Sequence, residues 1–259
     1  MRVIREVKMN RSPEFILLAW LLFFQNPQAL SKTTITLGKI IDTPDHYVGG
    51  ELLRAAYEHL GIEVKFNVMP AARSLVESST GHVDGEIQRI YEIQQHHPTL
   101  IRVPTPFNSI DITAFSQKYN FAVKGWESLK GYRIGRVRGI KFMELGLASF
   151  DQNKIHTVKS AGQLPKLTLS RRIDFYAIAK VNGVVQLKKN GIKAIHFLSP
   201  PLASIKMYHY LHKKNAFLVP KIDGVFKKMI KSGELEKLRK KIIKQLFNAK
   251  RDEIKPLVP

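Results

Sequence analysis

The chain contains no cysteine. That absence excludes a disulfide framework, a thiol nucleophile and a cysteine-based zinc site, and it leaves no cysteine to which a lipid could be attached. Acidic residues are also scarce: 21 Asp and Glu stand against 42 Lys and Arg, and the formal net charge is +21. A charge of this size is typical of proteins that meet nucleic acid or an anionic surface.

Long apolar runs are lacking as well. The apolar stretch FILLAWLLFF at residues 15 to 24 is too short to span a bilayer, which needs about 20 such residues. Basic residues precede it, and small residues follow at Ala29 and Ser31. This order predicts a cleaved signal peptide at residues 1–31; the alternative is an N-terminal core helix. We therefore expect an exported protein that is free in the periplasm, without a lipid anchor.

Export argues against nucleic acid as a partner of so basic a chain. The basic residues are densest at residues 227–251, where apolar residues recur at helical spacing. This pattern predicts helices whose charges form a solvated face, although a weak attraction to an anionic surface is a second interpretation. The apolar positions of this stretch are Met229, Ile230, Leu235, Leu238, Ile242 and Leu246.

Strand and helix patterns alternate along the rest of the chain, in one series before about residue 112 and another after it. With 259 residues, 44% of them hydrophobic, the chain is long enough for two α/β units built from parallel strands. Strands are predicted at 33–41, 62–70, 81–90, 100–106, 110–117, 132–137, 154–158, 171–180 and 204–214. Helices are predicted at 48–61, 71–81, 140–150, 160–170 and from about 215 onward, with DTPDHY (42–47) as a loop.

Five segments resemble, in the same order, the family 3 extracellular solute-binding proteins, which are the periplasmic amino-acid-type binding proteins of ABC importers. The segments are LLRAAYEHLGIEVKFNVMPAARSL, GHVDGEIQR, PTLIRVPTP, SLKGYRIGRVRGIKF and YHYLHKKNAFLVPKIDGVFKKMIKSGEL. The resemblance implies an α/β type II periplasmic binding protein fold with two lobes, each a mostly parallel sheet flanked by helices. Two crossover hinge strands would join lobe 1 (32–112 and 206–259) to lobe 2 (113–205), with a ligand in the cleft between them.

The segment GHVDGEIQR predicts a strand whose far end carries Glu86, Gln88 and Arg89. In open α/β sheets, ligands bind beyond the carboxyl ends of the strands, so Arg89 and Glu86 are candidate ligand-binding residues. The alternative is that Glu86 and Arg89 pair with each other or with helix ends, as buried charges usually must. The residues alone leave both interpretations open.

Two features that the resemblance would place at the cleft are missing. In the amino-acid binders, a Thr-x-x-Arg-like turn after this strand holds the ligand carboxylate, but YEIQQHHP at residues 91–98 contains no arginine. An acidic residue that would bind the ligand ammonium corresponds to a position near Ala179. A standard α-amino acid is therefore not the expected ligand.

Basic residues instead surround a predicted strand-to-helix turn in GRVRGIKF, where free backbone N–H groups favour an anion. Arg138, Gly139, Ile140 and Lys141 are therefore candidate ligand-binding residues, and Arg73 in MPAARSL is another. For each basic residue, an ordinary surface charge is the competing interpretation. The remaining candidates are Asp174, in the motif RRIDFYAIAK, and the aromatic residues Tyr47 and Phe107, for which a core position is the alternative.

Enzymatic function is not expected. His209 and His212, like His96 and His97, lack a carboxylate at metal-ligand spacing, and no Gly-x-Ser-x-Gly, Walker or Rossmann pattern is present. No catalytic residue, metal or cofactor is therefore predicted.

The resemblance implies a monomeric binding protein that captures a small polar solute and delivers it to an inner-membrane permease. The basic candidate residues favour an anionic solute. The alternative is an exported sensor or interaction protein that has kept the fold, has lost amino-acid binding, and signals through a membrane partner.

Overall fold

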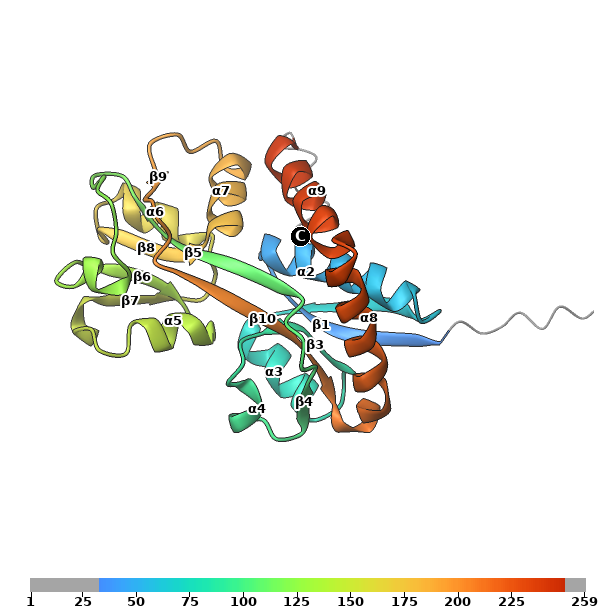
Figure 1. Cartoon of the computed structure of the whole chain (residues 1–259). Coiled ribbons are helices and arrows are strands. Elements are labelled where there is room, and N and C mark those ends of the chain that lie inside the picture. The colour runs from blue at the N-terminus through green and yellow to red at the C-terminus, as the bar shows by residue number, and fades with distance from the viewer. Residues whose placement is uncertain (1–32, 250–259) are drawn as a thin grey trace, which may run out of the picture. The chain divides into compact units, whose positions relative to one another are not determined.

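The structure is a computed structural model that describes residues 33–249. The predicted signal peptide lies outside this range. Two sets of strands and helices follow one another along the chain and form two lobes (Figure 1). The first lobe contains β1 (Thr34–Ile40), α2 (Pro44–Glu58), β2 (Glu63–Met69), α3 (Ala71–Ser79), β3 (Gly85–Arg89), α4 (Ile93–His96) and β4 (Leu100–Arg102).

The second lobe has the same alternation. It contains η1 (Trp126–Leu129), β6 (Ile134–Val137), α5 (Lys141–Gly146), η2 (Gln152–Lys154), β7 (Ile155–Val158), α6 (Gln163–Leu169), β8 (Phe175–Ala179), α7 (Lys180–Lys189) and β9 (His196–Phe197). The chain then returns to the first lobe and ends there in η3 (Lys213–Leu218), α8 (Val219–Lys231) and α9 (Glu234–Asn248).

Two long strands, β5 (Asn108–Ser116) and β10 (Ala203–His212), connect the lobes and pair antiparallel with each other (Figure 1). The sheet order is β2-β1-β3-β10-β5-β8-β6-β7, with β4 on β10 and β9 on β5. Within each lobe, β1 lies parallel to β2 and β3, and β6 lies parallel to β7 and β8. The predicted α/β class and the two crossover strands are thus confirmed. The predicted lobe boundaries fall inside β5 and β10 and stay a prediction.

Each lobe has a core that follows from its apolar spacing. On α2, Val48, Leu52, Leu53 and Ala56 face one side and pack with β1, β3, α8 and α9 in the first-lobe core. An amphipathic helix of this kind is stabilised by packing its apolar face against the core. In the second lobe, Phe115, Leu164, Ile173, Tyr176 and Ile178 form a core on one side of the sheet.

Local structure differs from the sequence prediction at two helices. α2 begins at Pro44, inside the stretch predicted as a loop, because proline is favoured in the first turn of a helix. The helix predicted at 160–170 is present as α6, and it accommodates Pro165 in its first turn, where the missing N–H would have no intrahelical partner. α7 was not predicted at all.

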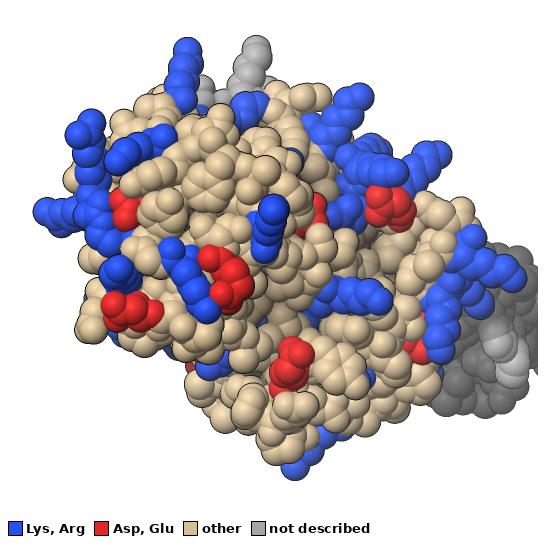
Figure 2. Space-filling view, turned by 60° about the vertical axis from the view of Figure 1, so that its left-hand side comes forward, with Lys and Arg blue, Asp and Glu red and all other residues tan. Residues whose placement is uncertain are grey.

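Basic side chains outnumber acidic ones on the face of the molecule that Figure 2 shows. Figure 2 shows Lys and Arg distributed over most of the visible face, with fewer acidic side chains among them. No helix within residues 33–249 is long and apolar enough to cross a membrane.

Candidate ligand-binding cleft

A cavity of about 290 Å³ lies between the lobes. Its walls come from the carboxyl ends of strands in both lobes and from the turns that follow them, at Ile40, Pro70 and Arg89 in the first lobe and Val137, Lys159 and Ile178 in the second. This is the place at which open α/β sheets bind ligands. Most of the lining is apolar: Ile40, Ile41, Pro70, Ala71, Ala72, Ile90, Ile93, Val137, Ile140, Phe142, Ala161, Ile178 and Met207.

Arg89 ends β3 and lines this cavity, although it is only 5% exposed. Its Nε donates to Oε2 of Glu86 at 2.9 Å, and its Nη2 donates to the carbonyl oxygen of Ala71 at 3.0 Å. Within residues 33–249, no hydrogen bond uses the remaining nitrogen, Nη1. Arg89 is therefore paired with Glu86, which is one of the two interpretations from the sequence, and it also lies at the cavity wall; ligand contact stays a prediction.

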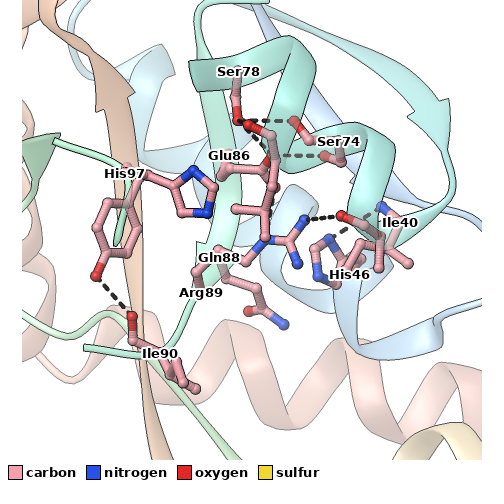
Figure 3. Close-up of polar contacts among 12 residues, drawn as sticks. Ile40, His46, Ser74, Ser78, Glu86, Gln88, Arg89, Ile90 and His97 are labelled. Carbon is pink, nitrogen blue, oxygen red and sulfur yellow. Dashed lines mark hydrogen bonds and ion pairs between the residues drawn. The ribbon is translucent and has the colours of Figure 1, made fainter. Parts of the chain in front are cut away.

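Glu86 serves as the anchor of this arginine. It is fully buried, and its second oxygen, Oε1, accepts hydrogen bonds from the hydroxyls of Ser74 at 2.7 Å and Ser78 at 2.8 Å, both on α3 (Figure 3). A buried ion pair keeps its geometry only when its remaining lone pairs are satisfied. Glu86 and the two serines thus hold the guanidinium of Arg89 in one orientation.

His46 lies beside Arg89, as Figure 3 shows, and it also lines the cavity. Its Nδ1 accepts a hydrogen bond from the backbone N–H of Ile40 at 3.3 Å. Burial, together with the positive charges of Arg89 and Lys39, holds the pKa of His46 well below the ordinary 6.5. A neutral imidazole that accepts at Nδ1 carries its proton on Nε2. His46 therefore adds an N–H donor next to Arg89.

Asp45 is the only carboxylate among the described residues that line the cavity, and both of its oxygens are occupied. Oδ1 accepts from Nδ2 of Asn182, on α7 of the second lobe, and Oδ2 accepts from Nε2 of Gln88 at 3.0 Å. The backbone N–H of Asp45 donates to Oδ1 of Asn182 at 2.7 Å. Burial raises the pKa of Asp45, which favours its neutral form. These contacts join the two lobes beside the crossover strands.

The same network continues away from the cavity. Oε1 of Gln88 accepts from Nδ2 of Asn108 at 2.8 Å, and Oδ1 of Asn108 accepts from Nε of Arg239 at 3.0 Å. Asn108 begins the crossover strand β5, and Arg239 lies on α9. The amides that hold Asp45 are thereby fixed in their own orientations.

The second lobe contributes basic side chains of a different kind. Arg138, Lys141 and Lys159 line the cavity but are exposed. Lys141 Nζ pairs with Glu144 at 2.9 Å, whereas the side chains of Arg138 and Lys159 make no hydrogen bond or ion pair to another residue in 33–249. Since α5 has only six residues, the anion preference of this turn rests on these side chains rather than on a helix terminus.

The lobes touch at Gly139, in the turn between β6 and α5. A Cβ added to Gly139 would lie 3.2 Å from the backbone nitrogen of Ala72, at the start of α3, and 3.4 Å from the Cβ of Ala72. Gly139 also has a φ of +78°, a left-handed conformation that favours glycine. The cleft is therefore closed around the cavity at this point, and a side chain at this position would oppose that closure.

Of the ten residues predicted from the sequence, Arg89, Arg138, Ile140 and Lys141 line the cavity, and Gly139 lies at the contact between its walls. The other five lie elsewhere. Glu86 is behind Arg89, and the Arg73 side chain, 70% exposed, turns outward to pair with Glu77.

Three remaining predicted residues belong to other parts of the molecule. Phe107 stacks on Phe226 in the first-lobe core, with ring centroids 5.0 Å apart. Tyr47 packs against that core, beside the amino group of Lys39. Asp174 pairs with Arg133 on the second lobe at 2.7 Å, and this arginine lowers the pKa of Asp174.

Sequence patterns missed Asp45, His46, Lys159 and Asn182 as lining residues, whereas Gln88 belongs to the strand end predicted to face the cleft. The Thr43-Pro44 pair is a helix-start signal that would have placed Asp45 and His46 in a first turn at the end of β1. No group of three or more His, Cys, Asp or Glu side chains within 33–249 is arranged to hold a metal ion.

Comparison with known proteins places this geometry in context. No family model matches the chain. An uncharacterized protein of Shewanella oneidensis is 25% identical over 219 residues, covering 81% of this chain and 82% of that protein.

Two solved structures are similar over most of their length. One is a histidine kinase sensor domain with similarity to periplasmic binding proteins, with a TM-score of 0.69, 19% identity and coverage of 81% of this chain and 96% of that one. The other is the amino acid ABC transporter substrate-binding protein AbpA from Streptococcus pneumoniae bound to L-arginine, with a TM-score of 0.68, 18% identity and coverage of 85% and 98%. These are binding and sensor domains rather than enzymes. The chain therefore has the type II periplasmic binding protein fold, as the resemblance in its sequence implied.

Proposed function

We propose that this chain is an exported solute-binding protein that captures a small anionic solute in the cleft between its lobes and presents it to an inner-membrane ABC permease. One observation carries the proposal: the Arg89 guanidinium and the His46 N–H lie side by side on a cavity wall, and the opposite wall adds Arg138 and Lys159. Asp45, the one carboxylate among the described lining residues, is occupied by amides.

The mechanism is capture by closure. A solute that touches both lobes stabilises the closed form over the open one, and it shifts the equilibrium only by its difference in affinity for the two. An anion held between Arg89 and Arg138 gains from both walls only when the lobes are together. The permease then distinguishes the closed shape from the open one.

The test is a thermal-unfolding screen of the full chain against inorganic anions, carboxylates, amino acids and amines of matched size. A ligand at 100 times its dissociation constant stabilises the folded state by about 2.7 kcal/mol, which raises the midpoint measurably. Carboxylates are expected to raise it and the matched amines to leave it unchanged. Stabilisation by amines but not by carboxylates would contradict the proposal.

A sensory role is the second candidate, because the fold is shared with a histidine kinase sensor domain. Deleting the gene separates the two. Loss of uptake of the bound solute supports transport. Unchanged uptake with a lost transcriptional response to that solute supports signalling through a membrane partner.

A further inference from the structure

We infer that the solute of this cleft is a monoanion with an apolar body and no ammonium group, such as a branched-chain or aromatic carboxylate. This inference rests on the proposed function and narrows it to a ligand class. Three properties of the cavity support it: where its donors lie, what its acceptors are bonded to, and what covers the rest of its walls.

The donors lie together at one place. Nη1 of Arg89 and Nε2 of His46 are free of partners within the described part of the chain, while the other polar atoms of both side chains are held by Glu86, Ala71 and Ile40. Two adjacent, fixed N–H donors match the two oxygens of one carboxylate. Because both donors are oriented before a ligand arrives, their ordering costs little on binding.

The carboxylate and amide oxygens of the described lining already accept hydrogen bonds within the protein. An ammonium group brings three N–H donors and a full positive charge. In the described lining, the oxygens of Asp45, Gln88 and Asn182 each accept a hydrogen bond within the protein. The hydroxyl of Ser160 is an acceptor without a protein partner there, but it carries no charge. The nearby charges, on Arg89, Arg138, Lys141 and Lys159, repel a cation.

The remaining walls are apolar. Ile40, Ile90, Ile93, Phe142, Ile178 and Met207 come from both lobes and surround the space beyond the donors. The cavity, of about 290 Å³, leaves room for an organic body beyond the carboxylate group. A small polar dianion would leave these apolar walls without contacts and would bring a second charge to them.

The test is isothermal titration of the full chain with two matched sets of probes. The aromatic set is 3-phenylpropanoate, phenylalanine and 2-phenylethylamine, and the aliphatic set is 4-methylpentanoate, leucine and 3-methylbutylamine. Propanoate and succinate are the polar anion controls. We expect the deaminated carboxylate of at least one set to bind at least tenfold more tightly than its amino acid, and its amine not to bind. Each buried CH₂ gained over propanoate should tighten binding about fourfold, from about 0.8 kcal/mol per group.

The outcomes separate this inference from the proposed function. If succinate or an amino acid binds more tightly than both apolar carboxylates, the inference is overturned while anion capture stands. If amines bind and carboxylates do not, or if no probe binds, both are overturned.

A variant pair locates the binding. Arg138→Gln should weaken binding of the apolar carboxylate severalfold. Arg136→Gln, two residues away and bonded instead to Thr157, should leave it unchanged. Equal effects of the two substitutions would show that net charge, rather than the cavity, governs binding and would overturn the inference.

Discussion

Both walls of the cleft carry positively charged side chains, but those on the first lobe are buried and fixed by hydrogen bonds, whereas those on the second are exposed. On the first lobe, Arg89 is buried and its guanidinium is fixed by Glu86, Ser74 and Ser78, with neutral His46 beside it. On the second lobe, Arg138 and Lys159 are exposed, and their side chains make no hydrogen bond or ion pair to another residue among 33–249. A fixed donor selects a ligand, whereas a mobile surface charge mainly attracts one and is screened by salt.

This difference predicts separate roles for the two walls in ligand capture. Under the proposed function, the first lobe supplies the fixed anion site and the second lobe adds weaker contacts as the cleft closes. Substitutions on the first lobe should therefore abolish recognition, and substitutions on the second should change how well the cleft closes.

The largest effect is expected at Arg89. Arg89→Met leaves Glu86 as a buried, unpaired charge and should lower the free energy of unfolding by about 3–5 kcal/mol. It should also weaken anion binding about 100-fold or more, since truncating one partner of a buried charged contact costs about 2–5 kcal/mol. Urea denaturation and calorimetric titration measure the two effects separately.

The double variant Glu86→Gln/Arg89→Met is the control for this experiment. It removes both charges, so most of the lost stability should return while binding stays lost. Full anion affinity in the stable double variant would show that Arg89 serves the fold and not the ligand.

Acid should destabilise the first lobe. Burial lowers the pKa of His209 from 6.5 to about 4 and holds that of His46 well below 6.5, so the unfolded chain takes up these protons first. The stability that the two neutral histidines contribute is complete above about pH 6.5. It is lost as pH falls toward about 4, by up to about 1.4 kcal/mol per pH unit for each.

The raised pKa of Asp45 acts in the opposite sense, since its folded form is favoured when protonated. Burial also lowers the pKa values of His97 and His212, so four described histidines act against the carboxyl group of Asp45. We expect a net loss between pH 6.5 and 5, measured by denaturation at each pH. His209→Asn should flatten this dependence, and substitution of the exposed His59 should not. An unchanged slope in His209→Asn would contradict the assignment.

A smaller effect is expected at Gly139. Gly139→Ala places a methyl group against Ala72 and forces a left-handed φ on a residue with a side chain, at a cost of about 1–2 kcal/mol. The added group opposes closure, so affinity should fall about tenfold while the first lobe keeps its donors. Small-angle scattering with and without ligand should show a more open average shape. Gly131→Ala, at a positive φ but with open space around it, is the matched control.

The smallest effect is expected from the exposed charges. The double variant Arg138→Gln/Lys159→Gln should weaken binding severalfold at low salt and less at high salt, because exposed charges are screened. Titration at about 0.02 M and 0.5 M NaCl measures this dependence. A loss of affinity as large as that of the Glu86→Gln/Arg89→Met variant would contradict the difference that we propose between the two walls.

Much of the fold follows from patterns that are local in the chain. Alternating apolar strands, helices that end at glycines and the β-like stretch near residue 208 predict the two α/β series and their return strand. α7 was not predicted, because Asn182 and Gly183 weaken its helical pattern. The reason for the glycine lies far away in the chain, since a Cβ on Gly183 would collide with the ring of Phe115.

The candidate site was predictable only where its residues are close in sequence. Glu86 and Arg89 are three residues apart on one strand, so their pairing was one of two interpretations from the start. Asp45 and Asn182 are separated by 137 residues and meet only because β5 and β10 bring α2 and α7 together. No pattern within either segment indicates that contact.

A crystal structure of the chain with the apolar carboxylate that binds most tightly would test the central claim most directly. The account predicts that the ligand carboxylate lies within hydrogen-bond distance of Nη1 of Arg89 and Nε2 of His46, with its apolar body against Ile90, Phe142 and Met207. A carboxylate bound to the second lobe alone, or a ligand bound outside this cavity, would contradict it.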